Sequence, residues 1–114
     1  ALGPAHPDVA STLNHLAALL QAQGDLAGAR PHYERALAIR ERALGAGHPD
    51  TAFSLNNLAV LLRAQGDLAG ARPYYERALA IFAARLGDDH PRTRTVQGNL
   101  QHLLSELERQ GREP

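Results

Sequence analysis

Four residue types are absent from this chain of 114 residues: cysteine, methionine, tryptophan and lysine. Without cysteine the chain forms no disulfide and no thiolate metal site, and a reducing compartment is permitted. Without lysine the phosphate-binding pattern Gly-x-x-x-x-Gly-Lys cannot occur. All 12 basic residues are therefore arginine, which together with abundant alanine, glycine and leucine suggests a GC-rich bacterial genome.

Charge and hydropathy exclude further classes of protein. The 12 basic residues balance 12 acidic ones without clustering, so nothing attracts nucleic acid or an anionic membrane. No apolar run approaches the ~20 residues that cross a bilayer, and no signal peptide is visible. The sequence therefore predicts a cytoplasmic protein. Because there is no initiator methionine, we expect the true N-terminus to lie further upstream.

The chain repeats itself with a period of 42 residues. Residues 6–47 and 48–89 are identical at 29 of 42 positions, and the longest shared block lies at 22–31 and 64–73. His90-Pro91 begins a third unit, which matches only the first half of the pattern. Ala1-Leu2-Gly3 matches 43–45, so we expect the chain to begin on the tail of an earlier unit. Such a repeat predicts that neighbouring units stack to bury their apolar faces.

Each unit has the pattern of two helices. The first helix has apolar residues at i, i+3, i+4 and i+7, which form one helical face. The second has a similar stripe around Tyr33 or Tyr75. Gln-Gly-Asp at 23–25 and 65–67 separates the two, because glycine ends a helix and aspartate caps the next. Pro31 and Pro73 lie inside the second helices and are expected to bend their starts. The apolar positions of the first helices are Leu13, Leu16, Ala17 and Leu20, then Leu55, Leu58, Ala59 and Leu62.

These residues resemble a tetratricopeptide repeat. The pattern Leu55-x-x-Leu58-Ala59-x-x-Leu62, followed by Gly66, Ala71, Tyr75 and Ala78, matches the core positions of that family in order. The unit is longer than the usual ~34 residues. With Leu-Asn-Asn-Leu-Ala at 55–59, Tyr-Glu-Arg-Ala-Leu at 75–79 and a His-Pro start, it resembles the repeats of kinesin light chains, a variant also found in bacterial proteins. The resemblance implies an all-α, right-handed superhelical solenoid of antiparallel helix pairs.

Four segments follow from this pattern. Residues 1–5 are predicted to be the tail of a preceding repeat, residues 6–47 and 48–89 two full repeats, and residues 90–111 a C-terminal capping helix. The third unit departs from the pattern because Gln97 and Gln101 replace the expected Leu and Ala, and no Gly-Asp pair follows Leu104. A polar last helix is what a repeat array needs in order to end solubly.

The resemblance implies that the first helices line a concave groove. Helical spacing then places on the groove the side of each helix turned away from its leucines. That side comprises Ser11, Asn14, His15, Ala18 and Gln21, then Phe53, Asn56, Asn57, Val60 and Arg63, then Thr95, Gly98, Asn99, His102 and Ser105. The residues that we predict to contact a peptide are Asn14, His15, Gln21, Phe53, Asn56, Asn57, Arg63, Asn99 and His102.

Several of these residues have a second interpretation. Asn14 and Asn56 match the groove asparagines of the family, whose amides pair with both sides of a peptide backbone, but they can also bond within the scaffold. Arg63 either clamps a carboxylate or is a solvated surface residue. Phe53 and Phe82 either anchor a ligand or seal the contact between units. The strongly basic groove that binds acidic peptides in the family is not evident, so that specificity is not carried over.

No metal, cofactor or catalytic site is predicted. His6, His48 and His90 occur once per unit, too far apart along a solenoid to share a zinc ion at bond lengths of ~2 Å, and capping of helix starts is the alternative role. No serine has a plausible base and oxyanion site nearby. We therefore predict that the protein is not an enzyme.

The sequence predicts a protein–protein interaction scaffold that binds an extended peptide or a partner domain in the groove, without nucleic-acid or membrane partners. The alternative is a structural or regulatory array of a larger signalling protein, for example one with a nucleotide-binding module, or a self-assembling array without a peptide ligand. The first helix pair lacks a preceding neighbour, so we expect an exposed apolar patch there and self-association through it.

Overall fold

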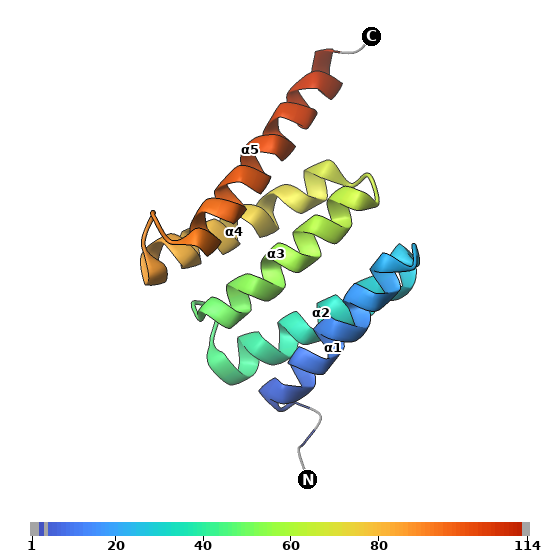
Figure 1. Cartoon of the computed structure of the whole chain (residues 1–114), viewed down its shortest axis with the longest axis vertical. Helices are drawn as coiled ribbons and strands as arrows, with labels where there is room; N and C mark the ends of the chain where they lie inside the picture. Colours follow the sequence, from blue (N-terminus) through green and yellow to red (C-terminus); the bar gives the residue numbers. More distant parts are fainter. Residues whose placement is uncertain (1–2, 4, 113–114) are drawn as a thin grey trace.

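The computed structural model describes residues 3 and 5–112 of the chain. Within them the chain forms helices and no strands (Figure 1). The predicted tail of a preceding repeat, at residues 1–5, lies mostly outside the described residues. The helices are α1 (Pro7–Ala22), α2 (Leu26–Leu44), α3 (Pro49–Ala64), α4 (Leu68–Leu86) and α5 (Pro91–Arg112).

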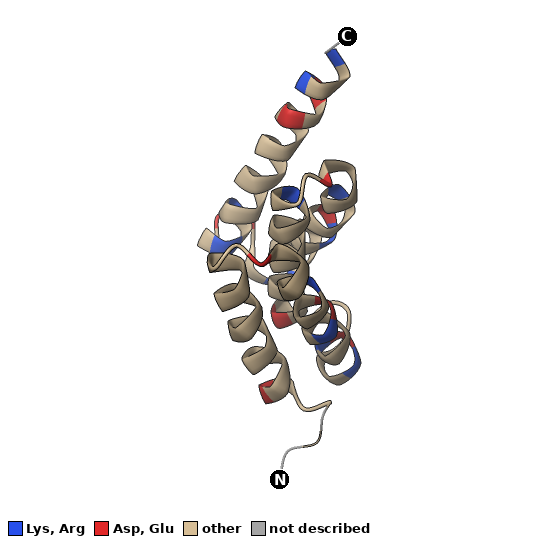
Figure 2. Ribbon diagram, turned by 90° about the vertical axis from the view of Figure 1, so that its right-hand side faces the viewer, with Lys and Arg blue, Asp and Glu red and all other residues tan. Residues whose placement is uncertain are grey.

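The helices form two layers. Helices α1, α3 and α5 lie on one side and α2 and α4 on the other (Figures 1 and 2). Each first helix packs against the second helix of its own unit, and the units join through α2 against α3 and through α4 against α5. The predicted all-α solenoid of helix pairs is confirmed. Charged residues gather on α2, on α4 and toward the C-terminal end of α5 (Figure 2), which leaves α1 and α3 largely uncharged.

The starts of the first helices share a histidine cap. The Nδ1 atom of His6 accepts a hydrogen bond from the backbone N–H of Asp8 at 3.1 Å, and His48 accepts from Asp50 at 3.0 Å. His90 caps α5 in the same way, accepting from Arg92 at 3.1 Å. The periodic histidines therefore satisfy helix-start N–H groups that would otherwise lack a partner.

The turn between the two helices of a unit depends on glycine at two places. Gly24 has φ of 87° and Gly66 has φ of 88°, in the left-handed region that glycine enters without strain. Four residues after Gly66, Gly70 lies inside α4, and its backbone N–H donates to Oδ1 of the N-cap Asp67 at 2.9 Å. A Cβ at Gly70 would lie 2.6 Å from Cγ of Asp67. A side chain at this position would therefore displace the capping carboxylate of Asp67.

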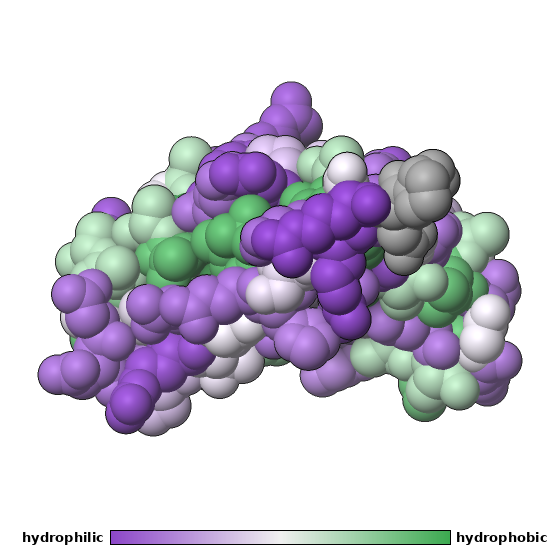
Figure 3. All heavy atoms as spheres, turned by 90° about the horizontal axis from the view of Figure 1, so that it is seen from above, coloured by the Kyte–Doolittle hydropathy of each residue, from purple (hydrophilic) through white to green (hydrophobic). Residues whose placement is uncertain are grey.

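The core is most complete in the middle of the array. Leu58 and Leu61 of α3 are 2% and 0% exposed, whereas their equivalents on α1, Leu16 and Leu19, are 41% and 61% exposed. The difference arises because α3 packs against the preceding α2, while no described residue takes that place beside α1. Seen from above, hydrophobic residues form a band between hydrophilic ones (Figure 3).

Helices α2 and α4 continue through Pro31 and Pro73 without interruption. Each proline removes one backbone donor, and the apolar residues on either side, Ala29 and Tyr33 in α2 and Ala71 and Tyr75 in α4, are buried. None of the helices in the described range is long and apolar enough to span a bilayer.

Candidate peptide-binding groove

Two cavities open along the first-helix layer, and Phe53 lines both. The α1–α3 cavity has a volume of about 240 Å³ and the α3–α5 cavity about 170 Å³. The Phe53 side chain is 40% exposed, which is unusual for a large aromatic residue in a well-packed unit. The α1–α3 cavity is lined by Ser11, Asn14, His15, Ala18, Tyr33, Arg40, Phe53 and Asn57. The α3–α5 cavity is lined by Phe53, Asn56, Phe82, Pro91, Arg92, Thr95 and Val96.

Arg40, from α2, is the charged residue of the α1–α3 cavity. It is only 7% exposed. Its Nη1 donates to the carbonyl oxygen of Asp50 at 3.2 Å and to Oγ of Ser54 at 3.1 Å, and its Nη2 donates to Oγ of Ser11 at 3.2 Å. Burial lowers the pKa of Arg40, and the negative charge of Asp50 partly opposes that shift. Arg40 therefore ties α2 to both neighbouring first helices.

The ring of Phe53 lies near two guanidinium groups. The Cζ atoms of Arg40 and Arg92 are each 5.9 Å from the centre of the ring. At this distance a cation is attracted to the negative face of an aromatic ring. The two cations therefore hold Phe53 at the boundary between the cavities while part of its surface remains accessible.

The two cavities differ in chemistry because three repeat positions change together. Where the first unit meets the second, these positions form a hydrogen-bonded cluster around Arg40. One repeat later the same positions are apolar, with Phe82 2% exposed and Val96 1% exposed. The three pairs of equivalent residues are Ser11 and Phe53, Arg40 and Phe82, and Ser54 and Val96.

The predicted groove asparagines bond within the scaffold. Asn14 is 5% exposed and donates from Nδ2 to Oγ of Ser54 at 3.4 Å. Asn56 accepts at Oδ1 from Nδ2 of Asn99 at 3.3 Å, which joins α3 to α5. Asn14 thus lies against Ser54 of the next unit, on a face of α1 that helical spacing alone leaves open. Both Asn14 and Asn56 also line a cavity, so peptide contact at their remaining groups stays a prediction.

Three further predicted residues also have partners within the scaffold. Gln21 accepts a hydrogen bond from the hydroxyl of Tyr33 at 2.9 Å. Arg63 contacts Oε1 of Glu106 with Nε and Nη2, both at 2.6 Å. His102 lies 4.0 Å from the same carboxylate oxygen. Arg63, which the sequence left as either a carboxylate clamp or a solvated surface residue, thus pairs with a carboxylate from α5 of the same chain.

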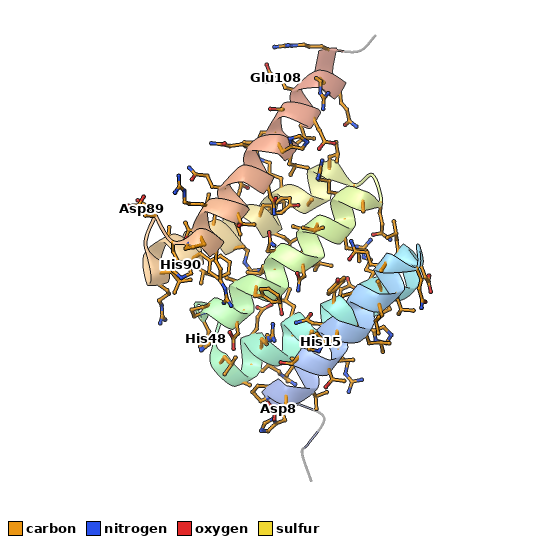
Figure 4. The ribbon with its side chains drawn as sticks, viewed as in Figure 1. Asp8, His15, His48, Asp89, His90 and Glu108 are labelled. Carbon is orange, nitrogen blue, oxygen red and sulfur yellow. The ribbon has the colours of Figure 1, made fainter. Side chains whose placement is uncertain are left out.

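Three accessible predicted residues line the α1–α3 cavity, whereas His102, which is also exposed, lines neither cavity. His15 is exposed on α1 (Figure 4), Asn57 is half-buried on α3, and Phe53 lies between the cavities. Phe82, by contrast, is buried and packs between units. The sequence interpretation did not include Arg40 in the groove, because Arg40 belongs to a second helix. Its replacement by Phe82 one repeat later was the available signal.

The periodic histidines do not form a cluster. His48 and His90 lie at the starts of different helices (Figure 4). Across the described residues, no group of three or more potential ligands among His, Cys, Asp and Glu is placed to hold a metal ion.

The helix pairs, the capped turns and the groove define a helical-repeat protein. A profile of the tetratricopeptide repeat family matches residues 8–84 and again residues 54–112. The chain therefore belongs to the tetratricopeptide repeat family. A comparison with curated protein sequences finds no match.

Solved structures place the chain near proteins of the kinesin-light-chain type. BtubC (BKLC) from P. vanneervenii is 28% identical with a TM-score of 0.81, over 89% of this chain and 40% of that chain. A putative kinesin light chain from Podosopora anserina with nearly identical TPR-like repeats is 27% identical with a TM-score of 0.81, over 91% of this chain and 49% of that chain. The chain thus spans less than half the length of either protein.

Proposed function

We propose that this chain is a protein–protein interaction scaffold that binds an extended peptide along the α1–α3–α5 layer. Tetratricopeptide repeats generally mediate interactions between proteins. The observation that supports this surface in particular is Phe53, which is exposed between two adjoining cavities. An exposed aromatic residue beside concave pockets is a common anchor for a bound partner.

We propose that the two cavities receive two side chains of one extended segment. Alternate side chains of an extended peptide point the same way and lie about 6–7 Å apart. The α3–α5 cavity, with Phe82 and Val96 in its wall, accommodates an apolar side chain. The α1–α3 cavity presents His15, Asn57 and Arg40 and accommodates a polar one. The peptide therefore crosses Phe53 in passing from one cavity to the other.

Selection of peptides from a displayed random library tests this proposal. The repeat itself supplies substitutions that the fold accepts, since Phe53→Ser and Asn57→His introduce the residues of the first unit. The matched control is Tyr74→His on α4, which likewise introduces the first-unit residue but lies away from both cavities. We expect the groove variants to lose at least ten-fold in affinity for the selected peptides and the control to retain it. Equal affinity in all the variants would remove the groove from the site.

We also propose that the outer face of α1 mediates self-association. Leu16 and Leu19 are 41% and 61% exposed, and adjacent exposed leucines are a common feature of protein contacts. Sedimentation velocity of wild type and Leu19→Gln tests this: the wild type is expected to form dimers or larger species as concentration rises and the variant to remain monomeric. A wild type that stays monomeric at the highest concentrations would contradict it.

The proposed function involves binding without a catalytic step. A structural or regulatory array within a larger signalling protein is the second candidate, and a library that yields no peptide for the wild type would favour it. The cytoplasmic location predicted from the sequence is part of this proposal.

A further inference from the structure

We propose that the chain forms a closed dimer in which α1 of one copy packs against α1 of a second copy across a two-fold axis. The inference rests on the self-association proposed above, and it names the partner surface and the size of the assembly. It is carried by two observations from opposite ends of the array: an uncharged outer stripe on α1 and a polar outer face on α5.

The outer stripe of α1 consists of Val9, Thr12, Leu16 and Leu19. These residues follow one another at spacings of three and four, so they lie along one face of the helix. In the second unit, where α2 packs against α3, the equivalent residues are at most 2% exposed: Thr51, Ser54, Leu58 and Leu61. The stripe therefore has the pattern of an interior face, although Leu16 and Leu19 are exposed.

The stripe is able to meet a copy of itself without electrostatic repulsion. In a two-fold contact the same patch lies on both partners, so residues near the axis meet their own copies. None of the four stripe residues is charged. The hydroxyl of Thr12 donates to the carbonyl oxygen of Asp8 at 3.2 Å, so its proton is already paired when the surface is buried. Burial of the two leucines then favours association.

The outer face of α5 is polar where the earlier first helices are apolar. In each of the first two units, one face of the first helix packs against the second helix of the same unit. On α3 this face is buried and consists of Ala52, Leu55, Ala59 and Leu62. The equivalent residues on α5 are Arg94, Gln97, Gln101 and Leu104, of which the first three are exposed. Further charges gather toward the C-terminal end of α5 (Figure 2).

This difference between the two ends limits the assembly to two copies. Head-to-tail contacts join two different surfaces and generate rings or open filaments. Here such a contact would press the leucines of one copy onto the polar face of α5, and polar groups removed from water without partners oppose association. Contact between two α1 stripes avoids this cost. Because each copy has one stripe, a dimer leaves no stripe free for a third copy.

The contact is small. A helix of 16 residues is about 24 Å long, and one face of it buries less than the about 800 Å² per partner of a standard stable interface. We therefore expect a weak dimer that forms as concentration rises.

The dimer leaves the peptide-binding groove accessible. None of the stripe residues lines the α1–α3 or the α3–α5 cavity. The cavities of both copies therefore stay open, and the dimer presents two grooves. A partner that carries two peptide segments then binds the dimer with greater avidity than a partner that carries one.

A charge-swap experiment on Thr12 tests the two-fold contact. Thr12 is exposed near the middle of the stripe, so its two copies come close together in the dimer. Thr12→Arg and Thr12→Glu each place like charges across the contact and should weaken the dimer by about ten-fold or more. An equimolar mixture of the two variants should dimerise again, because opposite charges then meet. Sedimentation equilibrium at a series of concentrations measures the mass of the species, and circular dichroism checks that each variant folds.

The matched control is the same pair of substitutions at the exposed Gln97 of α5. Gln97→Arg and Gln97→Glu should each dimerise as the wild type does. Thr12 variants that dimerise as strongly as the wild type, or a mixture of them that stays monomeric while the wild type dimerises, would overturn the contact between two α1 helices.

The masses also separate this inference from the proposed function. Wild-type species that grow beyond two copies would overturn the closed dimer and leave self-association in place. A wild type that stays monomeric would remove both and leave the stripe to a different occupant, such as a further repeat helix. Leu19→Gln should lose the dimer and keep its affinity for the selected peptides. If the dimer were kept in this variant, the stripe would not be the contact.

Discussion

Arg40 of the first repeat lies over the ring of Phe53 of the second, with 5.9 Å between the guanidinium carbon and the ring centre. This pair connects consecutive repeats and also marks the boundary of the two cavities. One repeat later Phe82 and Thr95 occupy the equivalent positions. The units therefore share a backbone pattern and differ in the chemistry of the groove, which is how a repeat array acquires specificity without changing its fold.

The turn glycines provide a first prediction. Gly70→Ala should lower the free energy of unfolding by about 1 kcal/mol, because the new Cβ displaces the capping carboxylate of Asp67. Gly98→Ala is the matched control, since Gly98 lies in α5 with nothing within 4 Å of its Cβ position. Gly98→Ala should raise the free energy of unfolding by about 0.5–1 kcal/mol. Urea unfolding measures both, and two changes of the same sign would contradict the capping account.

The Arg63–Glu106 pair provides a second prediction. The two side chains are 36% and 23% exposed, so part of their attraction is screened by solvent. A double-mutant cycle with Arg63→Gln and Glu106→Gln should give a coupling energy of about 0.5–1 kcal/mol that decreases as salt is added. A coupling that does not respond to salt would mean that packing, rather than charge, joins α3 to α5.

The buried tyrosines predict a dependence of stability on pH. Burial raises the pKa of Tyr33, and it raises the pKa of Tyr75 with a smaller lowering by Arg63 and a further raising by Glu106. The folded state thus favours the neutral phenols. Their contribution is fully present below the ordinary tyrosine pKa of about 10 and is lost as pH rises through the raised values. Unfolding free energies from about pH 8 to 11 should therefore fall, and fall less steeply for Tyr33→Phe with Tyr75→Phe. If the free energy of unfolding fell as steeply with pH in that variant as in the wild type, the buried tyrosines would not be the source of the pH dependence.

The fold was largely predictable from the sequence because each helix and turn of the unit occurs twice, and the residues that the two copies share mark the same structural positions. The 42-residue period, the Gly-Asp turns and the His-Pro starts locate the helices and their caps. The burial of Asn14 was not predictable from the spacing of a single helix, because its hydrogen-bond partner Ser54 lies in the next unit.

The site was predicted only in part. Phe53, His15 and Asn57 belong to the predicted groove face and line the α1–α3 cavity. The partner of Arg63 could not be predicted, because Glu106 lies 43 positions away on α5. Arg40 was missed because a second-helix residue reaches the groove only through the angle between the helices, which the sequence pattern does not contain.

The central claim is that a peptide lies across Phe53 on the first-helix layer, and mapping backbone amide shifts with a selected peptide tests it most directly. The account predicts that the largest shifts fall on residues lining the two cavities, with His15, Phe53 and Asn57 among them. Shifts confined to the charged α2–α4 layer, or to the exposed leucines of α1, would contradict it.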